Sequence, residues 1–346
     1  MTIRHSTDSS QENHPQSTVA IAYLSGLLQY IKDQGIPVAD LLAGTSLVEA
    51  DFAEKHRRVD GQTYFHLFEQ AVALTADPLL GLKVGSRVKP GNYGVIGYVV
   101  MACRTFGEVL LRSGRYQKLV GDIGYSEIVF VGEEAEVRWI ANYDAVPPSV
   151  VEEHMASIVT YARWLAGQDK KPSQIGFQHA AQGHRDVYEA VFQCDVVFEQ
   201  DHTVVRFPLA FTDIELPQFD MDLCNLLDRK AQTELEALEA ESEFVGAIKK
   251  IIRNGLPDGV PTLESVSVAL AKSEKTLQRE LGHFDTNFKA LLDNTRRELA
   301  LGYISNQAIE LNELAFLLGF SEQSAFQRAF KRWTGTTPGK FRRSLV

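Results

Sequence analysis

The chain has 346 residues, of which 45% are hydrophobic and 23% charged, and its formal net charge is −10. This length exceeds what one ordinary hydrophobic core serves, so two or three domains of a globular protein are expected. The three cysteines, Cys103, Cys194 and Cys224, lie far apart and form no C-x-x-C pair, which gives no sign of a disulfide framework or a structural zinc site. We therefore expect a cytoplasmic protein with no metal and no cofactor.

The chain begins with a polar segment that is followed by an apolar run. Residues 1–17 lack the apolar stretch of a signal peptide, so we predict a disordered tail there. The apolar run at 19–31 contains Gly26 and is shorter than the ~20 residues that a membrane-spanning helix needs. We interpret it as a buried helix and expect no contact with a membrane.

Residues 18–221 alternate segments of helical and strand-like pattern. Helical periodicity appears at 62–75, 105–120 and 149–166. Strand patterns appear at 126–131 and 136–142, with a hairpin between them, and at 174–179, 195–199 and 203–208. The sequence thus predicts a mixed α+β domain over 18–221.

The remainder of the chain is predicted to be all-α. Residues 222–243 are rich in Leu, Ala and Glu and predict a linker helix, and a turn-rich break follows at 253–261. Residues 241–346 carry a net charge of +3, whereas residues 1–240 carry −13. The last 24 residues hold six basic residues and no acid. This asymmetry suggests an anionic partner, although a solvated charged tail has the same composition.

A helix-turn-helix pattern is present at 311–334. Leucines at helical spacing lead to Gly319, which suits the end of a helix, and Ser321 suits the start of the next one. On a helical wheel the second helix separates an apolar side with Phe326, Phe330 and Trp333 from a polar side without acids. The polar side carries Gln323, Ser324, Gln327, Arg328 and Lys331. Such side chains suit base edges and phosphates.

A second, weaker unit of the same kind is present upstream, at 263–284. Ser273 corresponds to Ser321, but Ala271 occupies the turn position where glycine is expected, and Glu280 flanks the polar side. The segment 287–305 between the two units has a helical apolar stripe. A helix of that length is roughly 27 Å long, which approaches the ~34 Å between successive major-groove faces of B-DNA.

These features resemble the DNA-binding domain of the AraC/XylS family of bacterial transcriptional regulators. The resemblance covers 244–343 and is carried by "RRELALGYI", by "ELAFLLGFSEQSAFQRAFKRWTGTTPGKFR" and by the spacing of the two units. It implies two helix-turn-helix units, joined by a long helix, that enter adjacent major grooves of double-stranded DNA. The base-reading positions implied are Lys275, Gln278 and Arg279 in the first unit and Gln323, Ser324 and Arg328 in the second. Residues that flank them are expected to hold phosphates, namely Thr276, Gln327, Lys331 and Arg332.

The first domain resembles the arabinose-binding type of sensor found in longer members of this family. The segment "GNYGVIGYVVMACRTFGEVLLRSGRYQKLVGD" at 91–122 carries this resemblance. It implies a module that binds a small-molecule effector and forms a homodimer, in a protein that acts at promoters together with RNA polymerase. Weak candidates for effector contact are the aromatic and basic residues Trp139, Tyr143, Tyr161, Arg163 and Trp164, which equally suit a core.

The sequence therefore predicts a DNA-binding transcriptional regulator under effector control, and the resemblance favours an activator over a repressor. An alternative is an enzyme of the DNA-alkylation repair type fused to such a DNA-binding module. That chemistry needs an activated cysteine or a cysteine-rich zinc site, and three isolated cysteines argue against it.

Overall fold

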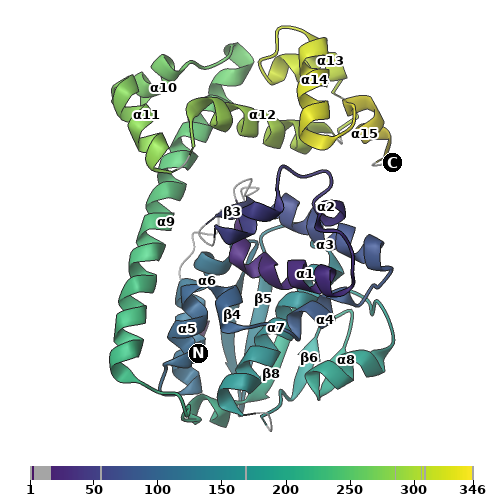
Figure 1. Ribbon diagram of the computed structural model, residues 1–346, viewed down its shortest axis with the longest axis vertical. Helices are drawn as coiled ribbons and strands as arrows, with labels where there is room; N and C mark the ends of the chain where they lie inside the picture. The colour runs from purple at the N-terminus through teal and green to yellow at the C-terminus, as the bar shows by residue number, and fades with distance from the viewer. Residues whose placement is uncertain are drawn as a thin grey trace. The chain divides into compact units, whose positions relative to one another are not determined.

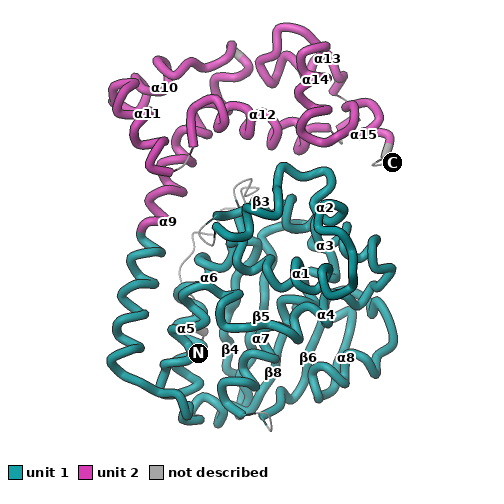
Figure 2. Tube along the Cα trace, viewed as in Figure 1, with its two compact units in different colours: residues 1–236 teal, residues 237–346 magenta. Residues whose placement is uncertain are grey.

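The computed structural model describes residues 2–3, 17–54, 57–167, 170–284, 286–304, 306–307 and 309–344 (Figure 1). The chain divides into two compact units, Met1–Glu236 (unit 1) and Ala237–Val346 (unit 2), as Figure 2 shows. Unit 1 mixes helices with strands and unit 2 is helical, so the predicted fold class is confirmed. The predicted tail at 1–17 lies mostly outside the described residues, although Thr2–Ile3 forms a short strand, β1.

Unit 1 is built around a six-stranded sheet with the strand order β1-β4-β5-β8-β6-β7. Strands β6 and β7 are parallel and joined through α8, whereas the other neighbours are antiparallel. The strands are β4 (Gly124–Val131), β5 (Glu134–Ala141), β6 (Gln174–Gly176), β7 (Asp195–Val197) and β8 (Thr203–Pro208). A separate antiparallel pair is formed by β2 (Thr18–Ala20) and β3 (Arg58–Asp60).

The predicted hairpin is confirmed, with a turn of two residues. Val131 pairs with Glu134, and Gly132 between them has a φ of +60°, a conformation that glycine adopts without steric cost. The predicted strands at 174–179 and 195–199 are each shorter in the structure, where they end at Gly176 and Val197.

The helices of unit 1 agree with the predicted periodicity where the prediction was made. The longer ones are α1 (Ile21–Asp33), α3 (Gly61–Thr75), α6 (Phe106–Val120) and α7 (Pro148–Ala166). The shorter ones are α2 (Val38–Leu41), η1 (Glu49–Ala53), α4 (Leu80–Gly85), η2 (Pro90–Tyr93), α5 (Val95–Met101), α8 (Arg185–Phe192) and η3 (Leu209–Asp213). None of these short elements was predicted, because one or two turns give too few residues for a period to be visible.

Helices α4 and α7 pack with their backbones in direct contact. A Cβ added to Gly81 would lie 2.0 Å from the carbonyl oxygen of Ser149, and one added to Gly85 would lie 2.4 Å from that of Glu153. The two glycines are four residues apart and share one side of α4. This close approach positions α7, which carries several of the residues described below.

Helix α9 (Met221–Gly255) is longer than the linker helix predicted at 222–243. Its first part belongs to unit 1, where Cys224, Ala231 and Leu235 join the core. Its last part belongs to unit 2, where Ile248 and Ile252 are fully buried. Residues 244–252 contain one glycine and no proline, so nothing ends the helix before the predicted turn-rich break.

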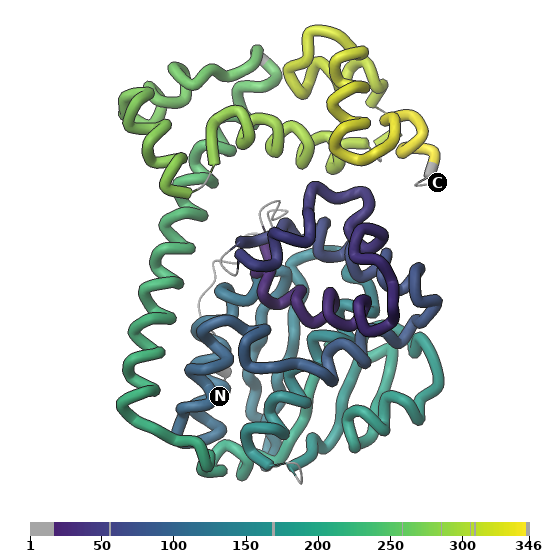
Figure 3. The backbone as a smooth tube through the Cα atoms, viewed as in Figure 1, coloured from purple at the N-terminus to yellow at the C-terminus, as the bar shows by residue number. Residues whose placement is uncertain are grey.

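Unit 2 contains two small helical cores on a common helix, α12 (Phe288–Ile304), which Figure 3 shows in light green. The first core is closed by α10 (Leu263–Ala269) and α11 (Glu274–His283), after the short η4 (Leu256–Asp258). The second is closed by α13 (Leu311–Leu317), α14 (Gln323–Thr334) and α15 (Pro338–Ser344). This is the predicted pair of helix-turn-helix units joined by a long helix.

Candidate nucleic-acid interface and ligand cavity

Helix α14 is held by its apolar side, which leaves its polar side accessible. Phe326 and Phe330 are fully buried, and their rings meet edge to face with centroids 5.6 Å apart. On the opposite side Ser324, Gln327, Arg328, Lys331 and Arg332 are exposed and Gln323 is half-buried. The second set of predicted DNA-contacting residues therefore lies on the surface of one helix.

Arg328 and Ser324 both interact with a carboxylate at the start of α14. The helix begins one residue later than predicted, so Glu322 and not Ser321 precedes it. Glu322 accepts a hydrogen bond from Ser324 Oγ and one from Arg328 Nη2 at 3.4 Å, and these bonds lower the pKa of Glu322. Arg328 Nη1 also lies 3.2 Å from Ser324 Oγ. Glu322 thus orients two of the predicted base-reading side chains before any partner arrives.

Arg332 has a partner within unit 2. Its Nη2 lies 2.7 Å and 3.0 Å from the two carboxylate oxygens of Asp293 on α12. Trp333 Nε1 donates to the same carboxylate at 3.0 Å. Asp293 therefore ties α14 to the connecting helix, and a phosphate contact by Arg332, which stays a prediction, would share the guanidinium with this ion pair.

Helix α11 of the first helix-turn-helix unit, like α14, has a buried apolar side and a polar side directed to the surface. Ser273 Oγ accepts from the backbone N–H of Thr276 at 3.1 Å, which makes it the N-cap that the sequence indicated. Lys275, Gln278 and Arg279 are exposed and Thr276 is half-buried, whereas Leu277 and Leu281 are fully buried on the opposite side. Glu280, which flanks the polar side, is paired with Lys272 at 2.8 Å.

The turns of the two units require the same backbone conformation. Gly319 has a φ of +70°, and Ala271 at the corresponding position has a φ of +52°. The left-handed conformation costs a residue with a Cβ roughly 1–2 kcal/mol. The turn of the first unit is thus strained at Ala271, whereas the turn of the second unit has a glycine at the same position and is not strained there.

Arg296 on α12 is a positioning residue that the sequence reasoning missed. Its Nε donates to the carbonyl oxygen of Leu318 at 2.9 Å and its Nη2 to that of Gly319 at 2.8 Å. The guanidinium also lies over the ring of Phe320, 4.5 Å from its centroid. These contacts satisfy carbonyls at the end of α13 and fix the turn that aims α14. In the sequence, Arg296 is the first residue of the motif "RRELALGYI" that carries the family resemblance.

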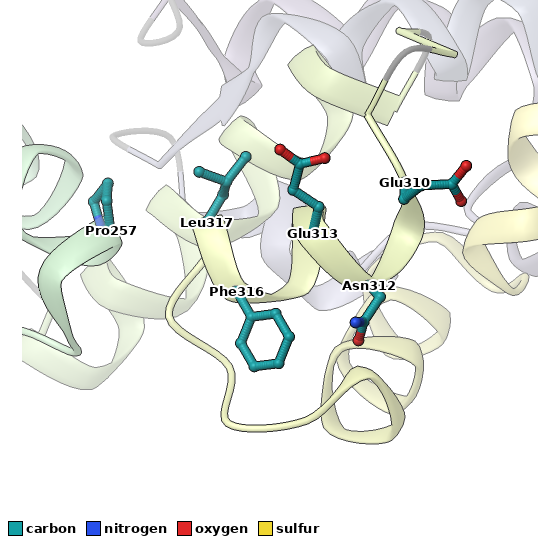
Figure 4. Close-up of a pocket in the computed structure, with 6 residues that line it drawn as sticks. All are labelled: Pro257, Glu310, Asn312, Glu313, Phe316 and Leu317. Atoms are coloured by element: carbon teal, nitrogen blue, oxygen red, sulfur yellow. The ribbon is translucent and has the colours of Figure 1, made fainter.

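An open depression on unit 2 is acidic and does not suit nucleic acid. It has a volume of about 540 Å³ and is lined by Pro257, Glu310, Asn312, Glu313, Phe316 and Leu317. In Figure 4 these side chains point in different directions, with the Phe316 ring directed away from the Glu313 carboxylate. Carboxylates repel phosphate, so this surface is distinct from the polar faces of α11 and α14.

Unit 1 contains a mostly apolar cavity of about 180 Å³ among α1, α3, α5, α6, α7, β4 and β5. Of the weak effector candidates, Trp139 and Tyr161 line it. The Trp139 ring packs against His154 with centroids 5.4 Å apart, and Tyr161 packs against Tyr93 at 5.3 Å. The cavity therefore gathers aromatic residues that lie more than a hundred positions apart in sequence, from Tyr23 to Tyr161.

The other three candidates do not line the cavity. Tyr143 packs edge to face on Phe65, with ring centroids 4.9 Å apart. Arg163 donates to the carbonyl oxygen of Val191 on α8 at 3.3 Å. Trp164 is 44% exposed. Arg163 and Trp164 follow Tyr161 on α7 but point to other sides of the helix, and Tyr143 precedes α7.

A buried carboxylic acid lies behind the tyrosines of the cavity. Glu153 accepts a hydrogen bond from Tyr64 at 3.3 Å, and burial raises its pKa to about 8. Tyr23 also contacts the carboxylate of Glu153, and the hydroxyl oxygens of Tyr23 and Ser157 are 2.9 Å apart. Burial also lowers the pKa of His154, which lines the cavity, to about 4. Both groups are therefore predominantly neutral near pH 7.

The raised pKa of Glu153 predicts a stability that depends on pH. Folded protein keeps the proton up to about pH 8, whereas an unfolded Glu loses it near pH ~4.3. This contribution is fully present below the unfolded value and is lost as the pH rises to about 8. Glu153→Gln removes this contribution, so the stability of the variant relative to the native chain is expected to rise between pH ~5 and ~8 by on the order of 3–4 kcal/mol.

Urea unfolding at several pH values measures this difference. The exposed Glu69 provides the control, since Glu69→Gln is expected to leave the pH dependence unchanged. A parallel pH profile for Glu153→Gln and the native chain would show that Glu153 is ionised in the folded state.

No group of three or more His, Cys, Asp or Glu residues suited to hold a metal ion is found among the residues that the structure describes. The same residues include no helix with both the length and the apolar character to cross a bilayer.

Comparison with known proteins gives matches to both units. A family model described as "Arabinose-binding domain of AraC transcription regulator, N-term" matches residues 35–216, more than half of the chain, and one described as "Helix-turn-helix domain" matches residues 266–344. The ornithine utilization regulator of Pseudomonas aeruginosa is 26% identical over 332 residues, which cover 95% of this chain and 98% of that protein.

Two further proteins cover most of the chain. An uncharacterized HTH-type transcriptional regulator of Mycobacterium tuberculosis is 28% identical over 330 residues, 92% of this chain and 94% of that protein. The crystal structure of the transcriptional regulator CdpR from Pseudomonas aeruginosa aligns at 20% identity and a TM-score of 0.46, over 93% of this chain and 98% of that one.

Proposed function

The chain belongs to the AraC family of transcriptional regulators, and from this premise we propose that α11 and α14 read duplex DNA while the cavity of unit 1 receives the controlling small molecule. The observation that carries the proposal is the pair of exposed polar helix faces, each backed by fully buried apolar residues. The connecting helix α12 has 17 residues and is roughly 25 Å long, so it suits two helices in successive major grooves.

Binding to the DNA upstream of its own gene, measured by fluorescence anisotropy at several salt concentrations, tests the DNA-binding part. Each phosphate that a basic side chain neutralises releases counterions, so affinity should fall steeply with salt. Affinity that is independent of salt, or equal for unrelated DNA, would contradict sequence-specific binding through these helices.

Arg328 is expected to read a base. Arg328→Ala should weaken binding to the native operator by about 1–3 kcal/mol and relax specificity at one base pair. Lys331→Ala is the comparator for a phosphate contact, and it should weaken binding to all sequences and reduce the salt slope by about 1. Binding of the variants to a library of single-base operator changes separates the two roles.

Loss of Arg328 also leaves the carboxylate of Glu322 without its guanidinium partner near DNA. The substitution is therefore repeated in a Glu322→Gln background, where no carboxylate is left. If specificity relaxes only when Glu322 is present, the effect of Arg328 is indirect.

We propose that the protein acts as a homodimer through unit 1. Apolar side chains are exposed around the start of α9, where Met221 is 61% exposed, Leu226 57% and Leu223 45%. Neighbouring apolar residues that a solvent-facing helix leaves uncovered typically mark an interface. Sedimentation equilibrium is expected to give twice the 38.6 kDa of one chain, and Leu226→Glu should return the mass of one chain.

We propose that the protein regulates transcription by binding DNA and not by an enzymatic reaction. The family resemblance favours activation through RNA polymerase. Repair-type chemistry needs a cysteine whose thiolate is accessible at neutral pH. Burial raises the pKa of Cys103 to about 12 and that of Cys194 to about 11, which disfavours a nucleophilic role for either thiol. A reporter fused to the target promoter, with and without the chain, distinguishes activation from repression.

A further inference from the structure

The described residues that line the cavity of unit 1 include no Asp, Glu, Lys or Arg. The only titratable groups among them are His154 and the four tyrosines Tyr23, Tyr64, Tyr93 and Tyr161. Burial lowers the pKa of His154 to about 4 and raises the pKa of each tyrosine above its usual value. The wall is thus uncharged near pH 7.

An uncharged wall selects against charged ligands. Moving an ion from water into such a site costs several kcal/mol unless an opposite charge meets it. The acid nearest to the tyrosines, Glu153, is not part of the lining and receives the hydroxyl of Tyr64. Neither a carboxylate nor an ammonium group would find a charged partner in the cavity.

The cavity also limits the size of a ligand. Its volume is about 180 Å³, and an apolar cavity of roughly 150 Å³ in another protein holds benzene. A single six-membered ring with one or two small substituents fits this space. Its aromatic wall, which includes Trp139, Tyr93 and Tyr161, offers edges and faces to such a ring.

One polar group of the wall is fixed in a way that favours an oxygen atom on the ligand. The amide oxygen of Gln117 accepts a hydrogen bond from the backbone N–H of Ser126 at 2.9 Å. This bond assigns the orientation of the amide and leaves its NH₂ as a donor without a partner among the described residues. A hydroxyl or carbonyl oxygen of the ligand would satisfy that donor.

We infer that this cavity binds an uncharged, mostly apolar molecule about the size of one substituted ring, whose hydroxyl or carbonyl oxygen accepts a hydrogen bond from Gln117. The inference rests on the proposed function only where it makes this molecule the effector. The binding itself is a property of unit 1 and is tested without DNA.

Four probes of matched size separate charge from polarity. Benzyl alcohol is neutral with a hydroxyl group, toluene is neutral without one, benzylamine is a cation and benzoate is an anion at pH 7. Isothermal titration of the full chain is expected to show saturable binding of benzyl alcohol, weaker binding of toluene by up to about tenfold, and binding of both ions weaker by at least about 100-fold.

Gln117→Leu removes the donor at nearly constant volume. It is expected to weaken the binding of benzyl alcohol to the level of toluene while toluene binding changes little. The melting temperature of the free protein is expected to fall modestly, because the backbone N–H of Ser126 loses its acceptor. Benzylamine or benzoate binding as tightly as benzyl alcohol would overturn the inference, and so would the failure of both neutral probes to bind near their solubility limits. Equal losses for benzyl alcohol and toluene would overturn the role of Gln117.

The proposed function is tested by a separate measurement of DNA affinity and promoter activity with and without the ligand. If benzyl alcohol binds to the cavity but DNA affinity and promoter activity are the same with and without it, the ligand class stands and effector control through this cavity fails. If a charged metabolite changes DNA binding while the neutral probes do not bind, control by an effector stands and the inferred ligand class fails.

Discussion

Replacement of Phe330 by alanine is expected to unfold the second helix-turn-helix unit and abolish specific DNA binding. Phe330 is fully buried and its ring contacts those of Phe326, Trp333 and Phe341 at centroid distances of 5.6, 6.5 and 5.5 Å. Truncation of a buried Phe costs about 3–5 kcal/mol because it removes these contacts and leaves a cavity. That is a large share of the ~5–15 kcal/mol that stabilises a typical domain.

Phe316→Ala is the matched control in the same unit. Phe316 is 52% exposed, so its truncation is expected to cost within about 0.5 kcal/mol. Urea unfolding and DNA binding are measured for both variants. Benzyl alcohol binding reports whether unit 1 is folded, and the Phe330 variant is expected to retain this binding. Equal stability losses for the two variants would show that the second core does not depend on Phe330.

The second large effect is expected at the contact between α4 and α7. Gly81→Ala places a Cβ 2.0 Å from the carbonyl oxygen of Ser149, a distance that only a shift of one backbone relieves. Overpacking typically costs about 1–3 kcal/mol, and a clash with a backbone atom is expected at the upper end of that range. Because α7 carries His154 and Tyr161, the same shift should also distort the cavity and weaken any ligand bound there.

Gly26→Ala on α1 controls for the general effect of replacing a helical glycine. Its added Cβ would lie 3.7 Å from the nearest side chain, Val84, which is ordinary van der Waals contact. It should therefore leave the melting temperature unchanged or raise it, since alanine stabilises a helix by about 1 kcal/mol relative to glycine. A native melting temperature for Gly81→Ala would contradict the close packing of α4 and α7.

The parts of the molecule that the sequence predicted are those encoded by local periodicity. The helical wheel assigned Phe326 and Phe330 to a hidden side of α14, and both are fully buried. Ser273 was matched to Ser321, the predicted N-cap of the second unit; Ser273 accepts a cap hydrogen bond, whereas Glu322 takes the place of Ser321 before α14. In both cases the signal and the interaction lie within four residues of each other.

The parts that the sequence did not predict depend on contacts between distant residues. Arg296 binds carbonyl oxygens 22 and 23 residues ahead of it, and Asp293 binds Arg332, 39 residues away. The cavity is assembled from residues between Val19 and Leu165. An apolar residue that faces a cavity has the same pattern in sequence as one that faces a filled core, so Trp139 and Tyr161 could not be separated from Tyr143.

Helix α12 gives unit 2 a thermodynamic property that neither helix-turn-helix unit has alone. Leu299 packs against the first core and the second core, while Leu291 belongs to one and Ile304 to the other. A helix that loses its packing on either core loses most of what keeps it helical, because short isolated helices are marginal in water. The two helix-turn-helix units are therefore expected to unfold together, so that loss of the second core, as in Phe330→Ala, should also destabilise the first core.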